Sequence, residues 1–319
     1  MKRLALSLVI LLTLGLSCKK TDDPVDAQPK TASDLLTETA SFSLFKAAVQ
    51  LAGLNDALKA TNLTVLAPTD DAFKAKGFST PESLKNIPAG ALENIIRYHL
   101  ITGVVTTKTP EVVAASNLRI DASNTSTLFL TNGPSGFFVN GNKVAKPDQV
   151  VANGVIHTIG ALLSPPTGNA VTALRNRADV GLLVAAITRA AIARPELLSI
   201  LSGTPTNPSL KQITFFAPND AALTAAGYRN TTDINNASPT SLANLISYHI
   251  IQGVVFSNQL QAGQVTTLST SGANKLTIAV PSSGPTVKGN GNATGVPIRE
   301  ADVVSQNAII HVINQVLLP

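Results

Sequence analysis

The chain has 319 residues, of which 44% are hydrophobic, 4% are aromatic and 13% are charged, and its formal net charge is +5. This length exceeds one typical domain and suits two. The basic residues are dispersed along the chain, without a basic block or a basic helix with interleaved aromatic residues, so no nucleic-acid partner is expected. The composition is typical of a compact exported protein.

The N-terminus has the layout of a bacterial export signal. Lys2 and Arg3 form a positive n-region, and residues 4–14 form an apolar run that is too short to span a bilayer. The segment ends at Leu-Ser-Cys18, which resembles the lipobox of bacterial lipoproteins. Cys18 is the only cysteine, so it has no disulfide partner within the chain. We therefore predict a signal peptide at residues 1–17 and lipidation of Cys18, with a plain secretory signal as the alternative.

Residues 18–30 are polar, charged and aperiodic, and they contain proline. Such a composition cannot bury a core, so a flexible tether is expected. Lys19 after the cysteine resembles outer-membrane sorting, and Asp22 and Asp23 resemble acidic signals for export to the outer face. The prediction is a cell-envelope lipoprotein, held in the outer membrane by its lipid anchor and exposed at the surface.

Helix signals come first after the tether. Apolar residues at helical spacing over 43–52, followed by Gly53, predict a helix, and residues 182–190 repeat this pattern. A short apolar strand over 64–67 is followed by Thr69, a natural N-cap for the next helix. A further amphipathic helix is expected at 91–100.

Strand signals fill the following stretch. Residues 128–131 and 137–144 predict antiparallel strands, and Asn140-Gly141 is a strong turn signal. Residues 155–163 predict a closing strand. Because helices fill the first half of this region and strands the second, the expected fold class is α+β with a β-sandwich or wedge core.

Three blocks of sequence occur twice, in the same order. The pairs are residues 64–73 and 214–223, residues 93–105 and 243–255, and residues 148–157 and 302–311. In the second pair, 8 of 13 positions are identical. Self-similarity of this kind predicts two domains of one fold, at residues 31–166 and 167–319. The linker around residues 165–168 is too short for wide independent motion.

The repeated blocks closely resemble the signatures of the fasciclin (FAS1) domain. These are Thr-Val-Leu-Ala-Pro-Thr-Asp-Asp-Ala-Phe at 64–73, Tyr-His at 98–99 and 248–249, and Asn-Gly-Val-Ile-His at 153–157. The resemblance covers nearly all of the chain after residue 30. It implies two tandem domains, each a β-sandwich wedge with packed helices, and an extracellular role in adhesion or ligand binding. The second copy departs at Leu223, in place of phenylalanine, and at Ala308, in place of glycine; we expect packing changes only.

All four histidines lie in the repeated blocks. His99 and His249 fall on the apolar stripes of their helices, and His157 and His311 share a strand face with apolar residues, so hydrogen-bonded core histidines are expected. The alternative is a metal-dependent hydrolase that uses His99 and His157 or their counterparts. A zinc site needs a third ligand, and the sequence has no HExxH motif. We therefore predict no metal, no cofactor and no catalytic residue.

The remaining candidates divide into binding and structural residues. The candidate binding residues, implied by the resemblance, are Tyr98, His99, Tyr248 and His249. The alternative for both tyrosines is packing at the edge of a helix. The predicted structural residues are Asp70, Asp220, Asn153, His157, Asn307 and His311. Among these, the two aspartates are expected to cap the helices that they begin.

The expected function is non-catalytic binding of an extracellular protein or polysaccharide by a membrane-anchored lipoprotein. A structural spacer that presents other envelope proteins is the alternative. The two copies differ most at residues 106–140 and 256–295, so these loops are expected to carry specificity.

Overall fold

The computed structural model describes residues 29–270, 272 and 274–319. The predicted signal peptide at 1–17, the lipidation site Cys18 and nearly all of the predicted tether lie outside the described residues. Within the described part of the chain, no helix is both long enough and apolar enough to cross a bilayer.

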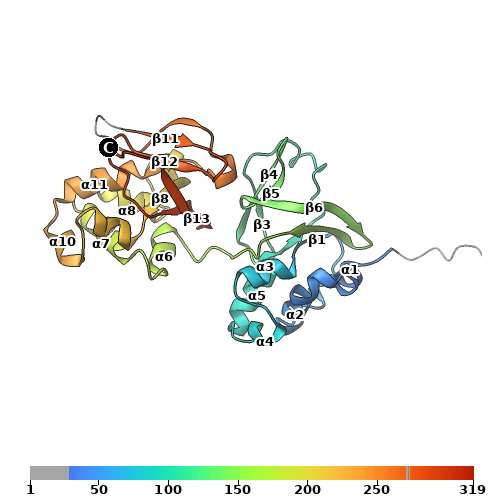
Figure 1. The fold of residues 1–319 in the computed structure, drawn as a ribbon. Coiled ribbons are helices and arrows are strands. Elements are labelled where there is room, and N and C mark those ends of the chain that lie inside the picture. Colours follow the sequence, from blue (N-terminus) through green and yellow to red (C-terminus); the bar gives the residue numbers. More distant parts are fainter. Residues whose placement is uncertain (1–28, 271, 273) are drawn as a thin grey trace, which may run out of the picture.

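Two domains of similar construction lie side by side, joined by a short extended linker (Figure 1). The helices of the first domain are α1 (Ala32–Glu38), α2 (Ser43–Leu51), α3 (Asp70–Ala75), α4 (Pro81–Leu84) and α5 (Ala89–Tyr98). Its strands are β1 (Leu63–Pro68), β2 (Leu100–Thr102), β3 (Leu118–Asp121), β4 (Thr127–Gly133), β5 (Gly136–Val139), β6 (Asn142–Val151) and β7 (Gly154–Ile159).

The second domain repeats this order with small changes. Its helices are α6 (Ala170–Arg175), α7 (Gly181–Ala190), α8 (Pro195–Leu201), α9 (Asp220–Ala225), α10 (Thr231–Asn236) and α11 (Pro239–Tyr248). Its strands are β8 (Ile213–Pro218), β9 (Ile250–Gln252), β10 (Gly263–Thr266), β11 (Lys275–Ala279), β12 (Thr286–Lys288), β13 (Val296–Val304) and β14 (Ala308–Ile313). Short 3₁₀ turns occur at Ala40–Phe42, Ala57–Lys59, Pro208–Leu210 and Ser257–Gln259.

Each domain is built on one seven-stranded mixed sheet, with the order β2-β1-β7-β6-β5-β4-β3 in the first and β10-β11-β12-β13-β14-β8-β9 in the second. In the first domain only β1 and β7 are parallel, and Val65 lies opposite Ile156. The corresponding parallel pair in the second domain is β8 and β14. All four of these strands are almost wholly buried, which explains their continuous apolar sequences.

The sheet of each domain folds over itself at one long strand. The pairing of β6 with β7 shifts register twice, and Asp148 at this irregularity has a φ of 57°. Bulges of this kind bend a strand and increase its twist. The bend brings β4 and β5 over β1, so that Leu66, Leu130 and Phe137 share one apolar cluster inside the wedge. The predicted α+β fold with a wedge-shaped β core is confirmed.

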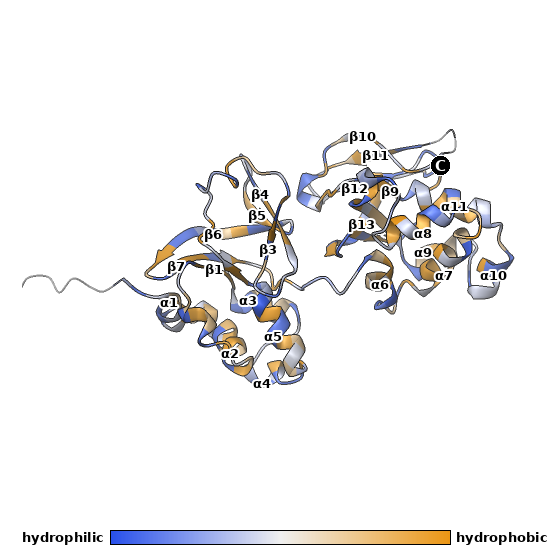
Figure 2. Ribbon diagram, turned by 180° about the vertical axis from the view of Figure 1, so that it is seen from behind, coloured by the Kyte–Doolittle hydropathy of each residue, from blue (hydrophilic) through white to orange (hydrophobic). Residues whose placement is uncertain are grey.

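The helices cover the outer side of the central strands. Side chains alternate along β1, so Val65 packs with the helices while Leu66 points into the wedge. Phe45 of α2 and Ile96 of α5 are fully buried against this side of the sheet. In Figure 2, hydrophobic and hydrophilic segments alternate along the helices of both domains, as expected for helices with one buried face.

The predicted local signals have clear counterparts. The helix predicted at 43–52 is α2, and the helix predicted at 91–100 is α5, shifted by two residues towards the N-terminus. Asn140 and Gly141 have φ values of 47° and 75°, and they form the tight turn between β5 and β6. At the position of Phe73, the second domain has Leu223, which borders a small apolar void next to His249.

Candidate functional site

Both tyrosines of the repeated Tyr-His pair are completely buried. The Tyr98 hydroxyl donates to the carbonyl of Thr127 and accepts from the Asn140 side chain, both at 2.8 Å. The Tyr248 hydroxyl donates to the carbonyl of Lys275 at 2.7 Å and accepts from a backbone N–H at 3.1 Å. Burial raises the pKa of Tyr98 above its usual range. Each tyrosine therefore ties the end of a long helix to the folded-over half of the sheet.

The neighbouring histidines are buried and neutral. The Nδ1–H of His99 donates to the carbonyl of Ile95 at 2.8 Å, and Nε2 accepts the N–H of Leu163 at 3.1 Å. His249 repeats this arrangement with Leu245 and Leu317. Because Nε2 accepts a backbone N–H, the proton must sit on Nδ1. Burial away from water lowers the pKa of both rings from 6.5 to about 4.

In the histidines of the last signature, too, both ring nitrogens hydrogen-bond to backbone groups. His157 accepts the N–H of Asp148 at Nδ1 and donates from Nε2 to the carbonyl of Val105, at 3.0 and 2.8 Å. The Asp148 carboxylate instead accepts from the hydroxyl and N–H of Thr107. His311 and Asp302 make equivalent contacts in the second domain.

This grouping of hydroxyl, carboxylate and imidazole lacks the order of a catalytic triad. In a triad the imidazole accepts from the nucleophilic hydroxyl and donates to the carboxylate. Here the hydroxyl donates to the carboxylate, and Nδ1 has no proton to donate. Among the described residues, no group of three or more His, Cys, Asp or Glu side chains could hold a metal ion.

The aspartates of the first signature cap a neighbouring helix. The Asp70 carboxylate accepts from the Ser43 hydroxyl at 2.7 Å and from the N–H of Leu44 at 2.8 Å, at the start of α2. Asp220 accepts from the N–H groups of Gly181 and Leu182 at the start of α7. The sequence pattern predicts that each carboxylate serves the helix it begins, but that end is already closed by the preceding residue, Thr69 or Asn219.

The asparagines of the last signature anchor the first helix of each domain. The Asn153 side chain accepts the N–H of Ala32 and donates to the carbonyls of Leu58 and Ala60. Asn307 accepts the N–H of Ala170 and donates to two carbonyls at the end of α8. Each side chain thus joins three separate segments of its domain.

These contacts bear on the predicted binding role of Tyr98, His99, Tyr248 and His249. The exposed fraction of these side chains is 0% for three of them and 1% for His249. A partner that binds the folded surface cannot touch them, so a direct contact stays a prediction that requires local opening. The surface available to a partner lies elsewhere.

The junction between the domains contains a polar contact that the sequence did not reveal. The side chains of Asn117 and Gln259 form a reciprocal amide pair, with N···O distances of 3.0 and 2.9 Å. Asn117 also donates to the carbonyl of Val254 at 2.8 Å, and Gln259 donates to the Thr131 hydroxyl at 3.1 Å. This network joins the two domains directly.

An apolar contact lies beside this network. The rings of Phe129 and Phe256 meet edge to face, with their centroids 5.7 Å apart, and Ile309 completes the cluster. Gly141 sits against it so closely that a Cβ atom there would lie 2.9 Å from both Phe256 and Asp302. A side chain at position 141 would therefore force Phe256 or Asp302 to shift, and the positive φ of 75° would strain the backbone there.

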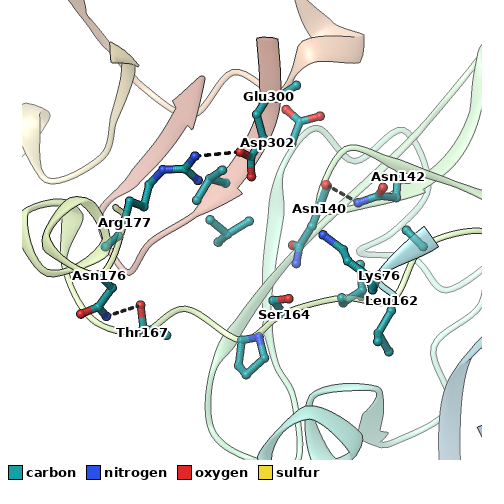
Figure 3. Close-up of a pocket in the computed structure, with 17 residues that line it drawn as sticks. Lys76, Asn140, Asn142, Leu162, Ser164, Thr167, Asn176, Arg177, Glu300 and Asp302 are labelled. Atoms are coloured by element: carbon teal, nitrogen blue, oxygen red, sulfur yellow. Dashed lines mark hydrogen bonds and ion pairs between the residues drawn. The ribbon is translucent and has the colours of Figure 1, made fainter. Parts of the chain in front are cut away.

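A charged cavity of about 570 Å³ opens between the domains on one side of this contact. Lys76, Asn140 and Asn142 line it from the first domain, and Arg177, Glu300 and Asp302 line it from the second (Figure 3). The Arg177 guanidinium binds both Glu300 and Asp179, which raises the arginine pKa. Arg177 and Glu300 are therefore already paired with each other, whereas Lys76 makes no ion pair with a described residue.

The paired junction residues Asn117, Gln259, Phe129 and Phe256 escaped prediction because they lie outside the repeated blocks. Phe256 occupies the position of Thr106 in the first copy, and Gln259 that of Thr109. The local hydrogen bond is the same in both, since the side chain at 109 or 259 accepts the N–H at 106 or 256. The sequence signal that could have pointed to the junction is the replacement of Thr106 and Thr109 by Phe256 and Gln259 in the second copy, within the loops predicted to carry specificity.

Comparison with known proteins agrees with the repeated fold. The Fasciclin domain family matches residues 40–165 and 186–319. The chain belongs to the fasciclin family. It is 32% identical over 142 residues to transforming growth factor-beta-induced protein ig-h3 of Sus scrofa, over 43% of this chain and 19% of that protein. It is 33% identical over 144 residues to human periostin, over 44% of this chain and 17% of that protein.

Shorter relatives also match. Protein sll1483 of Synechocystis is 36% identical over 129 residues, which covers 40% of this chain and 68% of that protein. A solved FAS1 domain pair from the insect cell adhesion molecule Fasciclin I matches 86% of this chain and 96% of that chain at 16% identity, with a TM-score of 0.40. The chain spans only about a fifth of the length of the porcine ig-h3 protein and of human periostin.

Proposed function

We propose that this fasciclin protein is a lipid-anchored surface lipoprotein that binds an extracellular protein or polysaccharide and catalyses no reaction. The observation that carries the proposal is the use of the histidines and of the repeated tyrosines in internal hydrogen bonds. The residues best suited to chemistry thus hold the fold together. The cavities that open between the domains support a partner site at the domain junction.

Anchoring through Cys18 suits this role. A diacylglyceryl group with a further acyl chain gives a stable membrane anchor, whereas one chain gives only marginal binding. The predicted tether would hold the domain pair away from the membrane surface. Two domains on one chain also allow higher avidity when both contact the same surface.

The proposal is tested with intact cells. A strain that lacks the chain is compared with a strain that expresses it, on arrays of immobilised matrix proteins and polysaccharides. We expect the expressing strain to adhere several-fold better to at least one surface. Cells with Cys18→Ala serve as the control, because loss of the anchor should release the protein and abolish the gain. Equal adhesion of the deletion and expressing strains to every surface contradicts the proposal and favours the spacer role.

A further inference from the structure

A second cavity, here called the neutral groove, lies at the domain junction beside the Asn117–Gln259 pair. Its volume is about 380 Å³, within the usual range for small-molecule sites, which often occur between domains. The turn at residues 133–136 forms one wall, and residues 254–261 of the second domain form the other. The groove therefore exists only when both domains are in place.

Among the described residues that line the neutral groove, none has a charged side chain. Lys143 is not a lining residue, although its side chain lies close to Gly136, which does line the groove. The charged cavity across the junction differs in this respect, because Lys76, Arg177, Glu300 and Asp302 all line it. The neutral groove thus suits a ligand without net charge, since an ion would lose its hydration there without gaining a counter-charge.

The floor of the neutral groove is fixed. Asn117, Thr131 and Gln259 line it and are bonded to one another, with Thr131 donating to Asn117 at 3.2 Å. Fully satisfied polar networks are rigid, and a rigid site loses less entropy when it binds a ligand.

The walls carry polar groups that are free to bind a ligand. The side chains of Asn258, Gln261, Ser116 and Ser135 are exposed, and none of them makes a hydrogen bond to another described residue. Planar amides offer two donors and two acceptor sites, and hydroxyls offer both roles. Phe138, half-buried in the same wall, adds one apolar ring surface.

This combination matches a neutral sugar. A pyranose ring presents hydroxyl groups around its edge and a C–H face that packs on an aromatic ring. An extended peptide fits less well, because β4 and β5 are paired along both edges and leave no strand edge for a peptide to extend. A single phenylalanine also provides no set of apolar pockets for peptide side chains.

We propose that the neutral groove binds a segment of a neutral polysaccharide, with Asn258 and Gln261 as hydrogen-bonding residues and Phe138 as the stacking surface. This inference rests on the proposed function and specifies its ligand class. Binding to single groove sites of this size is weak, so adhesion would come from many anchored copies on one polymer.

The test uses the full-length protein in detergent micelles and isothermal titration calorimetry. The probes are cellohexaose, laminarihexaose, maltohexaose and mannohexaose, with hexagalacturonate as the charged control. We expect at least one neutral hexasaccharide to bind, and the double variant Asn258→Ala/Gln261→Ala to weaken that binding about 10-fold, as expected for two lost hydrogen bonds. The matched control is Lys76→Ala in the charged cavity, which should bind like the unmodified protein.

Other results overturn the inference. These are preference for hexagalacturonate, binding that the double variant leaves unchanged, or no neutral binding at about 10 mM by protein whose thermal unfolding is normal. If the purified protein binds no hexasaccharide but the expressing cells still adhere, the groove inference is wrong and the adhesion proposal stands. If the purified protein binds a hexasaccharide through the groove but the expressing cells do not adhere, the adhesion proposal is wrong instead.

Discussion

Protonation of His99 would break the hydrogen bond that holds Leu163, because a proton on Nε2 would face the Leu163 N–H. The same conflict exists between His249 and Leu317. These histidines therefore couple the stability of each domain to pH. In the unfolded chain their pKa returns to 6.5, whereas in the folded protein it is about 4.

The sign of this coupling follows from the depressed pKa. Between about pH 6.5 and 4 the unfolded chain binds protons that the folded chain does not, so stability is complete above pH 6.5 and falls as the pH drops. We expect each histidine to cost about 2 kcal/mol of unfolding free energy between about pH 7 and pH 5. Urea unfolding at both pH values measures this loss.

The control for this prediction is His99→Gln, which cannot titrate. Its unfolding free energy will be lower at neutral pH, but its slope against pH should be shallower than that of the unmodified protein. Identical slopes would show that His99 does not contribute to the pH dependence.

At the level of elements, a few side chains decide how helices meet the sheet. Asn307 is almost completely buried, and it satisfies an N–H at the start of α6 and two carbonyls at the end of α8. Asn153 plays the same part in the first domain but is more exposed. At an exposed site water can replace a lost hydrogen-bond partner, whereas a buried donor or acceptor without a partner destabilises the fold by its full desolvation free energy.

We therefore expect Asn307→Ala to destabilise its domain by about 2–4 kcal/mol and Asn153→Ala by about half as much. Thermal unfolding of the two variants, side by side with the unmodified protein, gives the comparison. A larger loss for Asn153→Ala would mean that burial does not set the cost of these contacts.

Much of this element-level structure follows from local sequence. Periodicity located α2 and α5, and the Asn140-Gly141 pair located a turn, because each signal depends on residues close in the chain. The helix that Asp70 caps could not be predicted, since Ser43 lies 27 residues away and only the tertiary fold brings it close. The four histidines are buried in the structure, whereas the cavities depend on loops without periodicity.

At the scale of the whole molecule, the junction determines how the two domains act together. The short linker allows some motion, but the Asn117–Gln259 pair and the Phe129–Phe256 contact restrict it. Cavities on either side keep the contact small. The domains should therefore be coupled measurably but weakly.

A double-mutant cycle with Asn117→Ala and Gln259→Ala tests this coupling. We expect an interaction energy of about 1 kcal/mol between the two positions, because the two amides hydrogen-bond to each other directly while each also keeps a separate partner across the junction. Unfolding by denaturant provides the four free energies, and small-angle scattering should show a wider range of domain separations in the double variant. Strictly additive single effects would contradict a direct contact in solution.

The junction is head to tail, so in principle each domain still has one face free to accept another copy. Those free faces do not match. The position of Phe256 is Thr106 at the open end of the first domain, and the position of Phe129 is Thr277 at the open end of the second. Head-to-tail contacts that do not close can grow into filaments. At each of these two faces a threonine stands where the junction has a phenylalanine, so the edge-to-face ring contact that closes the junction cannot form there.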